Sequence, residues 1–143
     1  MKKWFGTLVV GLGLVLVGCD SGGSGDGDSG GGDVTKIVVI GDSIGTGFGV
    51  ATGFPNFLRS LSGVPVVNNS KASRQTGTGV GLASSLIASE QPSHLVVLLG
   101  TNDAIRGSVS GAVANLQRIA DIGREAGVTV VIGTLPPIPR NSG

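Results

Sequence analysis

Four short runs of β-branched and other aliphatic residues constrain the fold of this chain more than any other feature. They are Lys36–Ile40, Val64–Val67, Leu95–Leu99 and Val128–Ile132. Uninterrupted apolar runs of this length are typical of strands that are buried on both faces of a sheet. The sequence therefore predicts four strands between residues 34 and 143.

The segments between these runs have the pattern of helices, which we expect at residues 55–61, 80–89 and 109–126. In the third, five small or apolar residues recur in steps of four and three and so share one face, namely Val109, Val113, Leu116, Ala120 and Gly123. Gly127 is the predicted end of this helix. Because strands and helices alternate with short links, we expect right-handed crossovers and a parallel sheet.

The first residues of the chain look like a targeting segment. A basic start, Met1–Trp4, precedes 13 uncharged, mostly apolar residues, Phe5–Val17. This stretch has the length of a signal-peptide core, whereas a membrane-spanning helix needs about 20 residues. Leu16-Val17-Gly18-Cys19 resembles the lipobox of bacterial lipoproteins. The resemblance implies a signal peptide at residues 1–18 and a lipidated Cys19. The lipid would anchor the protein to a membrane of the bacterial cell envelope, facing outside the cytoplasm. An ordinary signal peptide and a buried segment that ends in Cys are the alternatives.

Residues 19–33 have the composition of a tether. Asp20–Asp33 contains no apolar residue and so cannot offset its ordering entropy by burial. A chain of this kind reaches roughly 20 Å, enough to hold a domain at 34–143 clear of lipid headgroups.

Composition excludes several classes of function. Residues 34–143 carry eight Lys and Arg against five Asp and Glu, with no dense basic run and few aromatic rings, so we expect no nucleic-acid partner. One Cys and one His exclude an internal disulfide framework and a Cys/His zinc site, and no metal is predicted. The glycines after the first strand do not have the dinucleotide-binding spacing, and the chain lacks the Gly-Lys-Ser/Thr of a P-loop.

In parallel sheets, functional groups gather in loops at the carboxyl ends of the strands. The first such loop reads Gly41-Asp42-Ser43-Ile44, and the third reads Gly100-Thr101-Asn102-Asp103. This pair of motifs resembles the SGNH/GDSL hydrolases, and the resemblance extends over residues 34–143, including the Thr134–Pro137 turn. It implies a three-layer, flavodoxin-like α/β fold with four of the usual five parallel strands present, in the order second, first, third, fourth. It also implies a cofactor-free serine esterase or lipase that acts on acyl, lysophospholipid or acetyl-sugar esters.

The resemblance assigns roles to residues in these loops. Ser43 is the expected nucleophile, and Asn102 is the expected side-chain donor to the oxyanion, with Asp42 and Gly100 in support. Taken alone, Asp42-Ser43 could be a helix N-cap and Asn102-Asp103 an Asx-turn.

The third oxyanion donor is predicted less directly. Aligning Asn69, Ser73 and Thr76 with the family's pattern places Arg74 where the family has a glycine whose backbone N–H binds the oxyanion. If that position requires a positive φ, arginine is strained there. Gly77 and Gly79 are alternatives under a shifted alignment.

The general base that the family resemblance leads us to expect has no counterpart in this sequence. The family carries an Asp-x-x-His pair after a fifth strand, whereas the one histidine here, His94, opens the third predicted strand. It should lie roughly 20 Å from Ser43, at the opposite end of the sheet. We therefore expect the chain to be a fragment of a longer protein and to be inactive alone. A lipid-anchored binding domain without catalytic activity is the alternative.

Overall fold

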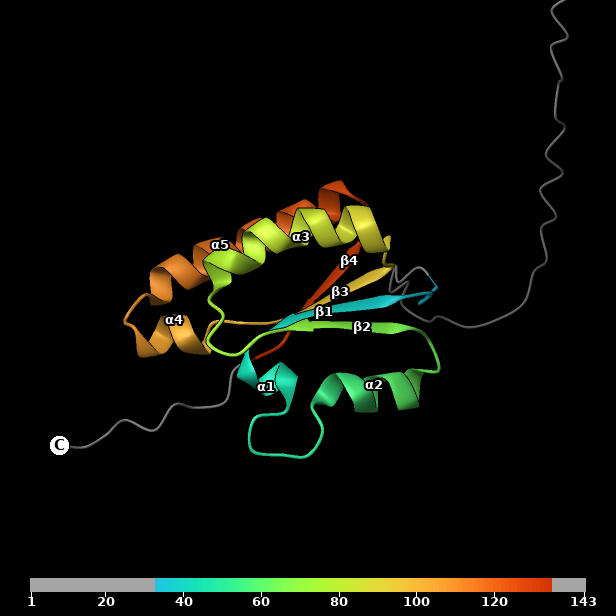
Figure 1. The fold of residues 1–143 in the computed structure, drawn as a ribbon. Coiled ribbons are helices and arrows are strands. Elements are labelled where there is room, and N and C mark those ends of the chain that lie inside the picture. Colours follow the sequence, from blue (N-terminus) through green and yellow to red (C-terminus); the bar gives the residue numbers. More distant parts are fainter. Residues whose placement is uncertain (1–32, 135–143) are drawn as a thin grey trace, which may run out of the picture.

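The centre of the fold is a parallel sheet of four strands, in a computed structural model that describes residues 33–134. The strands are β1 (Ile37–Gly41), β2 (Val66–Ser70), β3 (His94–Leu98) and β4 (Thr129–Ile132), in the order β2-β1-β3-β4 (Figure 1). This confirms the predicted α/β class and strand order. The predicted signal peptide, Cys19, almost all of the tether and the Leu135–Pro137 part of the turn lie outside the described residues.

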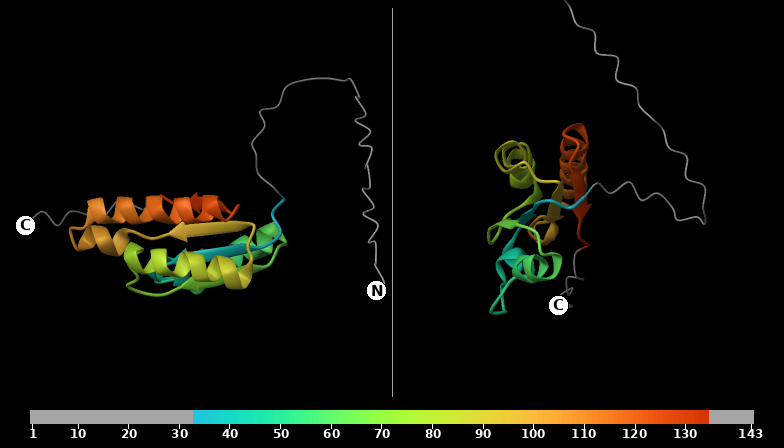
Figure 2. Two further views of the ribbon diagram at one scale, coloured as in Figure 1. Left: turned by 90° about the horizontal axis from the view of Figure 1, so that it is seen from above. Right: turned by 90° about the vertical axis from the view of Figure 1, so that its right-hand side faces the viewer.

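Helices flank the sheet on both faces. Figures 1 and 2 show α1 (Ser43–Thr46) and α2 (Phe54–Ser62) on one face, and α3 (Thr76–Glu90) and α5 (Val109–Glu125) on the other. A short helix, α4 (Thr101–Ile105), follows β3 directly. None of the helices in the described part of the chain is both long and apolar enough to cross a membrane.

β1 is the only one of the four described strands that is buried along its whole length. Val38 and Ile40 pack in the core beneath α3 and α5, whereas Ile37 and Val39 pack in a second core beside α2. In contrast, β3 alternates between buried and half-buried residues, and Val131 and Ile132 of β4 are exposed. Burial on both faces is therefore confirmed for β1, and the prediction was wrong for β4, whose outer edge has no partner strand within residues 33–134.

Helix α5 has the predicted length but presents a different face to the core. Its buried residues are Ala112, Ile119 and Gly123, whereas Val109 and Val113 are 57 % and 62 % exposed. The predicted face was therefore wrong in its first half, because α5 turns Ala112, rather than Val109 and Val113, toward the core. Gly127 does end the helix, with φ +69° and with the Val128 N–H donating to the Gly123 carbonyl at 2.8 Å.

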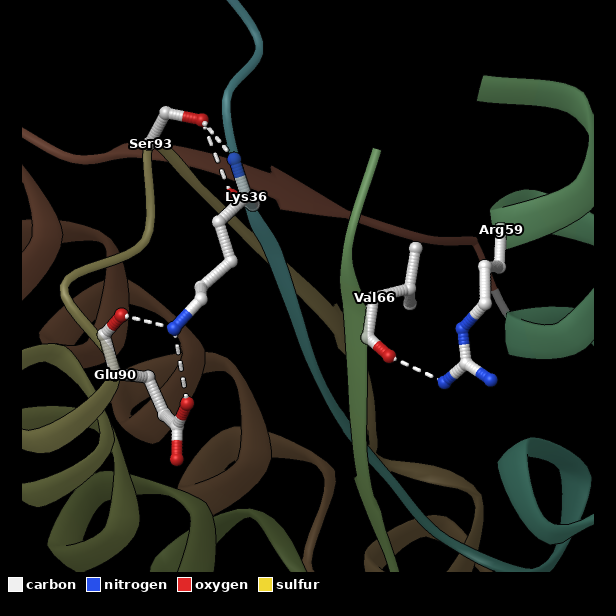
Figure 3. A network of polar contacts seen from close by, with 5 residues as sticks. All are labelled: Lys36, Arg59, Val66, Glu90 and Ser93. Carbon is white, nitrogen blue, oxygen red and sulfur yellow. Dashed lines mark hydrogen bonds and ion pairs between the residues drawn. The ribbon is translucent and has the colours of Figure 1, made fainter. Parts of the chain in front are cut away.

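A polar network closes the amino end of the sheet (Figure 3). Lys36 pairs with Glu90 at 3.2 Å, and the Ser93 hydroxyl donates to the Lys36 carbonyl at 3.0 Å. On the other face of the sheet, Arg59 of α2 donates to the Val66 carbonyl. These contacts attach the start of β1 to the end of α3, and the start of β2 to α2.

Candidate active site

The corner between β1 and α1 holds the predicted nucleophile. Asp42 is the N-cap of α1 and is only 1 % exposed, and its Oδ1 accepts a hydrogen bond from the Ile44 N–H at 2.9 Å. Ser43 is the first residue of the helix and is half-buried. The first N–H groups of a helix have no partner inside it, so the Ser43 N–H is available to a ligand. The N-cap interpretation of Asp42 is thus correct, and it is compatible with a functional Ser43.

The loop after β3 brings Asn102 to the same corner. Gly100 has φ +125°, a conformation that favours glycine, and this allows α4 to begin at Thr101, where no helix was expected from the sequence. In the first turn of α4, the Asn102 Nδ2 donates to the Arg74 carbonyl at 3.0 Å and to the Asp42 Oδ2 at 3.4 Å. One side-chain amide therefore joins the loops that follow β1, β2 and β3.

Arg74 lies in a tight turn after β2. Its backbone N–H donates to the Lys71 carbonyl at 3.2 Å, and the positive φ of this turn is at Ser73 (+62°) rather than at Arg74. The Arg74 N–H is thus engaged within its own turn, and its role as an oxyanion donor stays a prediction that requires this bond to open. Of the alternatives, Gly79 is buried against Leu99 and Ile119, away from the loop.

The Arg74 guanidinium has a role that the sequence did not indicate. Its Nη1 contacts the Gly41 carbonyl at 3.4 Å, the Asn69 Oδ1 at 3.1 Å and the Asn69 carbonyl. The cation therefore holds the carboxyl ends of β1 and β2 together. Partial burial lowers the pKa of this guanidinium by desolvation.

A buried hydrogen-bond network beside this corner was also not predicted from the sequence. The Asp103 carboxylate accepts from the Thr76 hydroxyl at 2.7 Å and from the Thr76 N–H at 3.0 Å, and the Asn115 Nδ2 donates to the same hydroxyl at 3.0 Å. Helix α3 has no side-chain cap from its own N-cap residue, Gln75, so Asp103 caps it from another element. This fixes the start of α3, and with it the Arg74 turn, relative to Asn102.

His94 lies where the sequence predicted, at the amino end of the sheet. It is the first residue of β3 and is in register with Ile37, whereas Gly41 at the carboxyl end is in register with Leu98. A cavity of about 300 Å³ lies next to the Arg74 turn, lined by Lys71, Ala72, Ser73, Arg74, Thr78 and Leu82. Neither Ser43 nor Asn102 lines it, so the candidate site is the open corner rather than this cavity.

Comparisons with known proteins agree with the fold described above. The model of the GDSL-like Lipase/Acylhydrolase family matches residues 39–143. An arylesterase of Vibrio mimicus is 27 % identical over 116 residues, covering 76 % of this chain and 58 % of the relative. The crystal structure of TesA is similar with a TM-score of 0.64 and 31 % identity, over 72 % of this chain and 63 % of TesA. AlinE4, an SGNH-hydrolase family esterase, is similar with a TM-score of 0.61 and 25 % identity, over 71 % of this chain and 59 % of AlinE4. The chain thus spans about 60 % of the length of these proteins.

Proposed function

The chain belongs to the GDSL-like lipase/acylhydrolase family, and we propose that its domain hydrolyses carboxylic esters through an acyl-enzyme on Ser43. The observation that carries the proposal is the Asn102 amide, which contacts Asp42 and the Arg74 carbonyl at the corner where Ser43 begins α1. The nucleophile and two donors, the Ser43 N–H and the Asn102 Nδ2, are thereby supplied by neighbouring strand ends.

The reaction has two steps. The Ser43 Oγ attacks the ester carbonyl carbon, the C–O bond to the alcohol breaks, and the alcohol leaves with the serine proton. Water then attacks the acyl-enzyme, which releases the carboxylic acid and restores the hydroxyl. In both steps the negative charge forms on the carbonyl oxygen, where the Ser43 N–H and the Asn102 amide donate to it. To donate to this oxygen, the Asn102 amide gives up its longer hydrogen bond, the one to the Asp42 Oδ2 at 3.4 Å.

The proton acceptor is not His94, which lies at the far end of β3. The Asp42 carboxylate is bonded to the Ile44 N–H and to Asn102, so it is also unsuited to take the proton from its neighbour. We therefore propose that the 143-residue chain attacks esters slowly, since removal of a triad member in other hydrolases leaves only about 10³–10⁴-fold catalysis over water.

A fluorophosphonate probe tests the proposal, because it reacts with a serine hydroxyl by loss of fluoride even where turnover is slow. We expect mass spectrometry to find the adduct on Ser43, and Ser43→Ala to abolish it. Ser93→Ala is the matched control and should leave the labelling unchanged. Labelling at another serine, or no labelling above the Ser43→Ala background, would contradict the assignment of the nucleophile.

A second candidate function is a binding domain that holds an ester or acid without turnover. The position of His94 favours it, because that histidine lies at the opposite end of the sheet from Ser43. The two candidates are distinguished by p-nitrophenyl acetate. Ser43-dependent release of nitrophenol supports the esterase, whereas saturable binding of the ester without release supports the binding domain.

We also propose that Cys19 carries a lipid and anchors the domain to a membrane of the bacterial cell envelope, facing outside the cytoplasm. The apolar run that ends at Leu16-Val17-Gly18-Cys19 supports this. In a bacterial host, the chain should partition into the detergent phase and Cys19→Ala into the aqueous phase. Aqueous partitioning of the unchanged chain would contradict the proposal.

A further inference from the structure

The end of α1 joins the backbone of an exposed aromatic residue to the backbone of Ser43, the proposed nucleophile. The Phe48 N–H donates to the Ser43 carbonyl at 2.9 Å, and the Gly47 N–H donates to the Ile44 carbonyl at 3.2 Å, with Gly47 at φ +90°. These two bonds and the left-handed glycine define a Schellman motif. In this motif the residue in the position of Phe48 commonly makes an apolar contact with the residue in the position of Ser43.

In this chain that apolar contact is not available, because the partner is a serine. Phe48 is 83 % exposed, and Val50, two residues later, is 65 % exposed. The loop that carries them projects away from the sheet between α1 and α2 (Figure 1). Its start is nevertheless fixed, since a Cβ on Gly47 would lie 2.6 Å from the Gly53 nitrogen, so the backbone before Phe48 packs tightly against the end of the loop.

We propose that Phe48, with Val50 in the same loop, binds the acyl chain of the ester and gives the site a preference for acyl groups longer than acetyl. This inference rests on the proposed function of Ser43. The Asn102 amide, which contacts Asp42 and the Arg74 carbonyl at this corner, suits the ester carbonyl but not a hydrocarbon chain. An acyl chain lying on the ring would remove apolar surface of both partners from water.

A pair of fluorophosphonates with ethyl and hexyl chains tests this preference. The chain length stands in for the acyl group, and reaction with Ser43 requires no turnover. We expect Phe48→Ala to lower the hexyl-to-ethyl ratio of labelling rates by about tenfold, the scale of one to a few methylenes in an apolar site. Phe48→Leu should restore most of the ratio.

Phe57→Ala is the matched control, because Phe57 is also an exposed phenylalanine, at 59 %, but lies on α2. It should leave the ratio unchanged. An unchanged ratio in Phe48→Ala, or an equal fall in Phe57→Ala, would overturn the proposal while leaving Ser43 as the nucleophile.

Failure of the proposed function gives a different result, namely no labelling of Ser43 by either probe. In that case the binding of sodium hexanoate and sodium acetate, followed by NMR of the full chain, decides the role of Phe48. The proposed role of Phe48 is supported if the chain binds hexanoate more tightly than acetate and if Phe48→Ala lowers the hexanoate affinity about tenfold. Equal affinities for the two acids overturn that role.

Discussion

Ser93 at the amino end of the sheet and Ser43 at the carboxyl end differ in whether their hydroxyls are hydrogen-bonded. At the amino end, the Ser93 Oγ donates to the Lys36 carbonyl, accepts from the Thr35 N–H at 2.9 Å and lies 3.1 Å from the His94 Nδ1. At the carboxyl end, the Ser43 hydroxyl makes no hydrogen bond within residues 33–134.

This difference distinguishes a structural serine from the proposed nucleophile. Ser93 and His94 are the only serine and histidine in contact within the described residues, yet that hydroxyl is fully used in holding the chain before β1. Around Ser43 the polar side chains bond to one another and leave the hydroxyl unoccupied. The Ser93–His94 contact is therefore structural, and it does not make Ser93 a candidate nucleophile.

Replacing each of the two serines with alanine should give the largest difference in activity. In a version of the protein that hydrolyses p-nitrophenyl esters, Ser43→Ala should lower kcat by at least about 10³-fold, because no covalent intermediate can form. Ser93→Ala should retain the activity and lower only the free energy of unfolding, by about 1 kcal/mol. Full activity of Ser43→Ala would contradict the placement of the nucleophile at the carboxyl end of the sheet.

Asn102 and His94 sharpen the same comparison. Asn102→Ala should lower kcat by about 10²–10³-fold through loss of an oxyanion donor, with little change in KM. His94→Ala should leave kcat unchanged, since the ring lies at the other end of β3. A large loss of activity in His94→Ala would show that the histidine reaches the site by another route.

Asp103 should dominate the stability of the carboxyl end. Asp103→Ala leaves the buried Thr76 N–H without its acceptor and should lower the free energy of unfolding by about 1–3 kcal/mol, measured by urea denaturation. Asp103→Asn keeps one acceptor oxygen and should lower the free energy of unfolding by less. Equal losses in both variants would show that the charge at the start of α3, rather than the hydrogen bond, is what stabilises it.

The ion pair at the amino end should have the smallest effect. Lys36 and Glu90 are 33 % and 31 % exposed, so solvent screens their attraction. Glu90→Gln should lower the free energy of unfolding by about 0.2–1 kcal/mol, less than Asp103→Asn, by the same urea measurement. A larger loss than for Asp103→Asn would contradict the ranking of the two networks.

The parts of the fold that could be predicted are those encoded by neighbouring residues. The run that became β1, the turn at Gly41 to Ser43 and the end of α5 at Gly127 each depend on local pattern. The first half of the α5 face could not be predicted, because helical periodicity does not determine whether the stripe through Val109 and Val113 or the neighbouring one through Ala112 and Ile119 faces the core.

The parts of the site that could not be predicted depend on contacts between distant residues. Thr76 and Asp103 are 27 residues apart, and the Arg74 guanidinium reaches the Gly41 carbonyl across 33 residues. No short motif encodes such pairs. The alignment placed Arg74 in the loop after the second strand, but only the folded backbone shows that the positive φ of this turn belongs to Ser73.

The position of β1 at the centre of the sheet also affects how the chain folds. β1 is made first but pairs with β2 and β3, and its start contacts Ser93, which is 57 residues away from Lys36. The apolar edge of β1 that faces β3 stays open until residues 94–98 are available for pairing. Because such distant pairings must form before the core closes, folding should be slow for a domain of this size, and chaperones that bind extended apolar segments have time to act on β1.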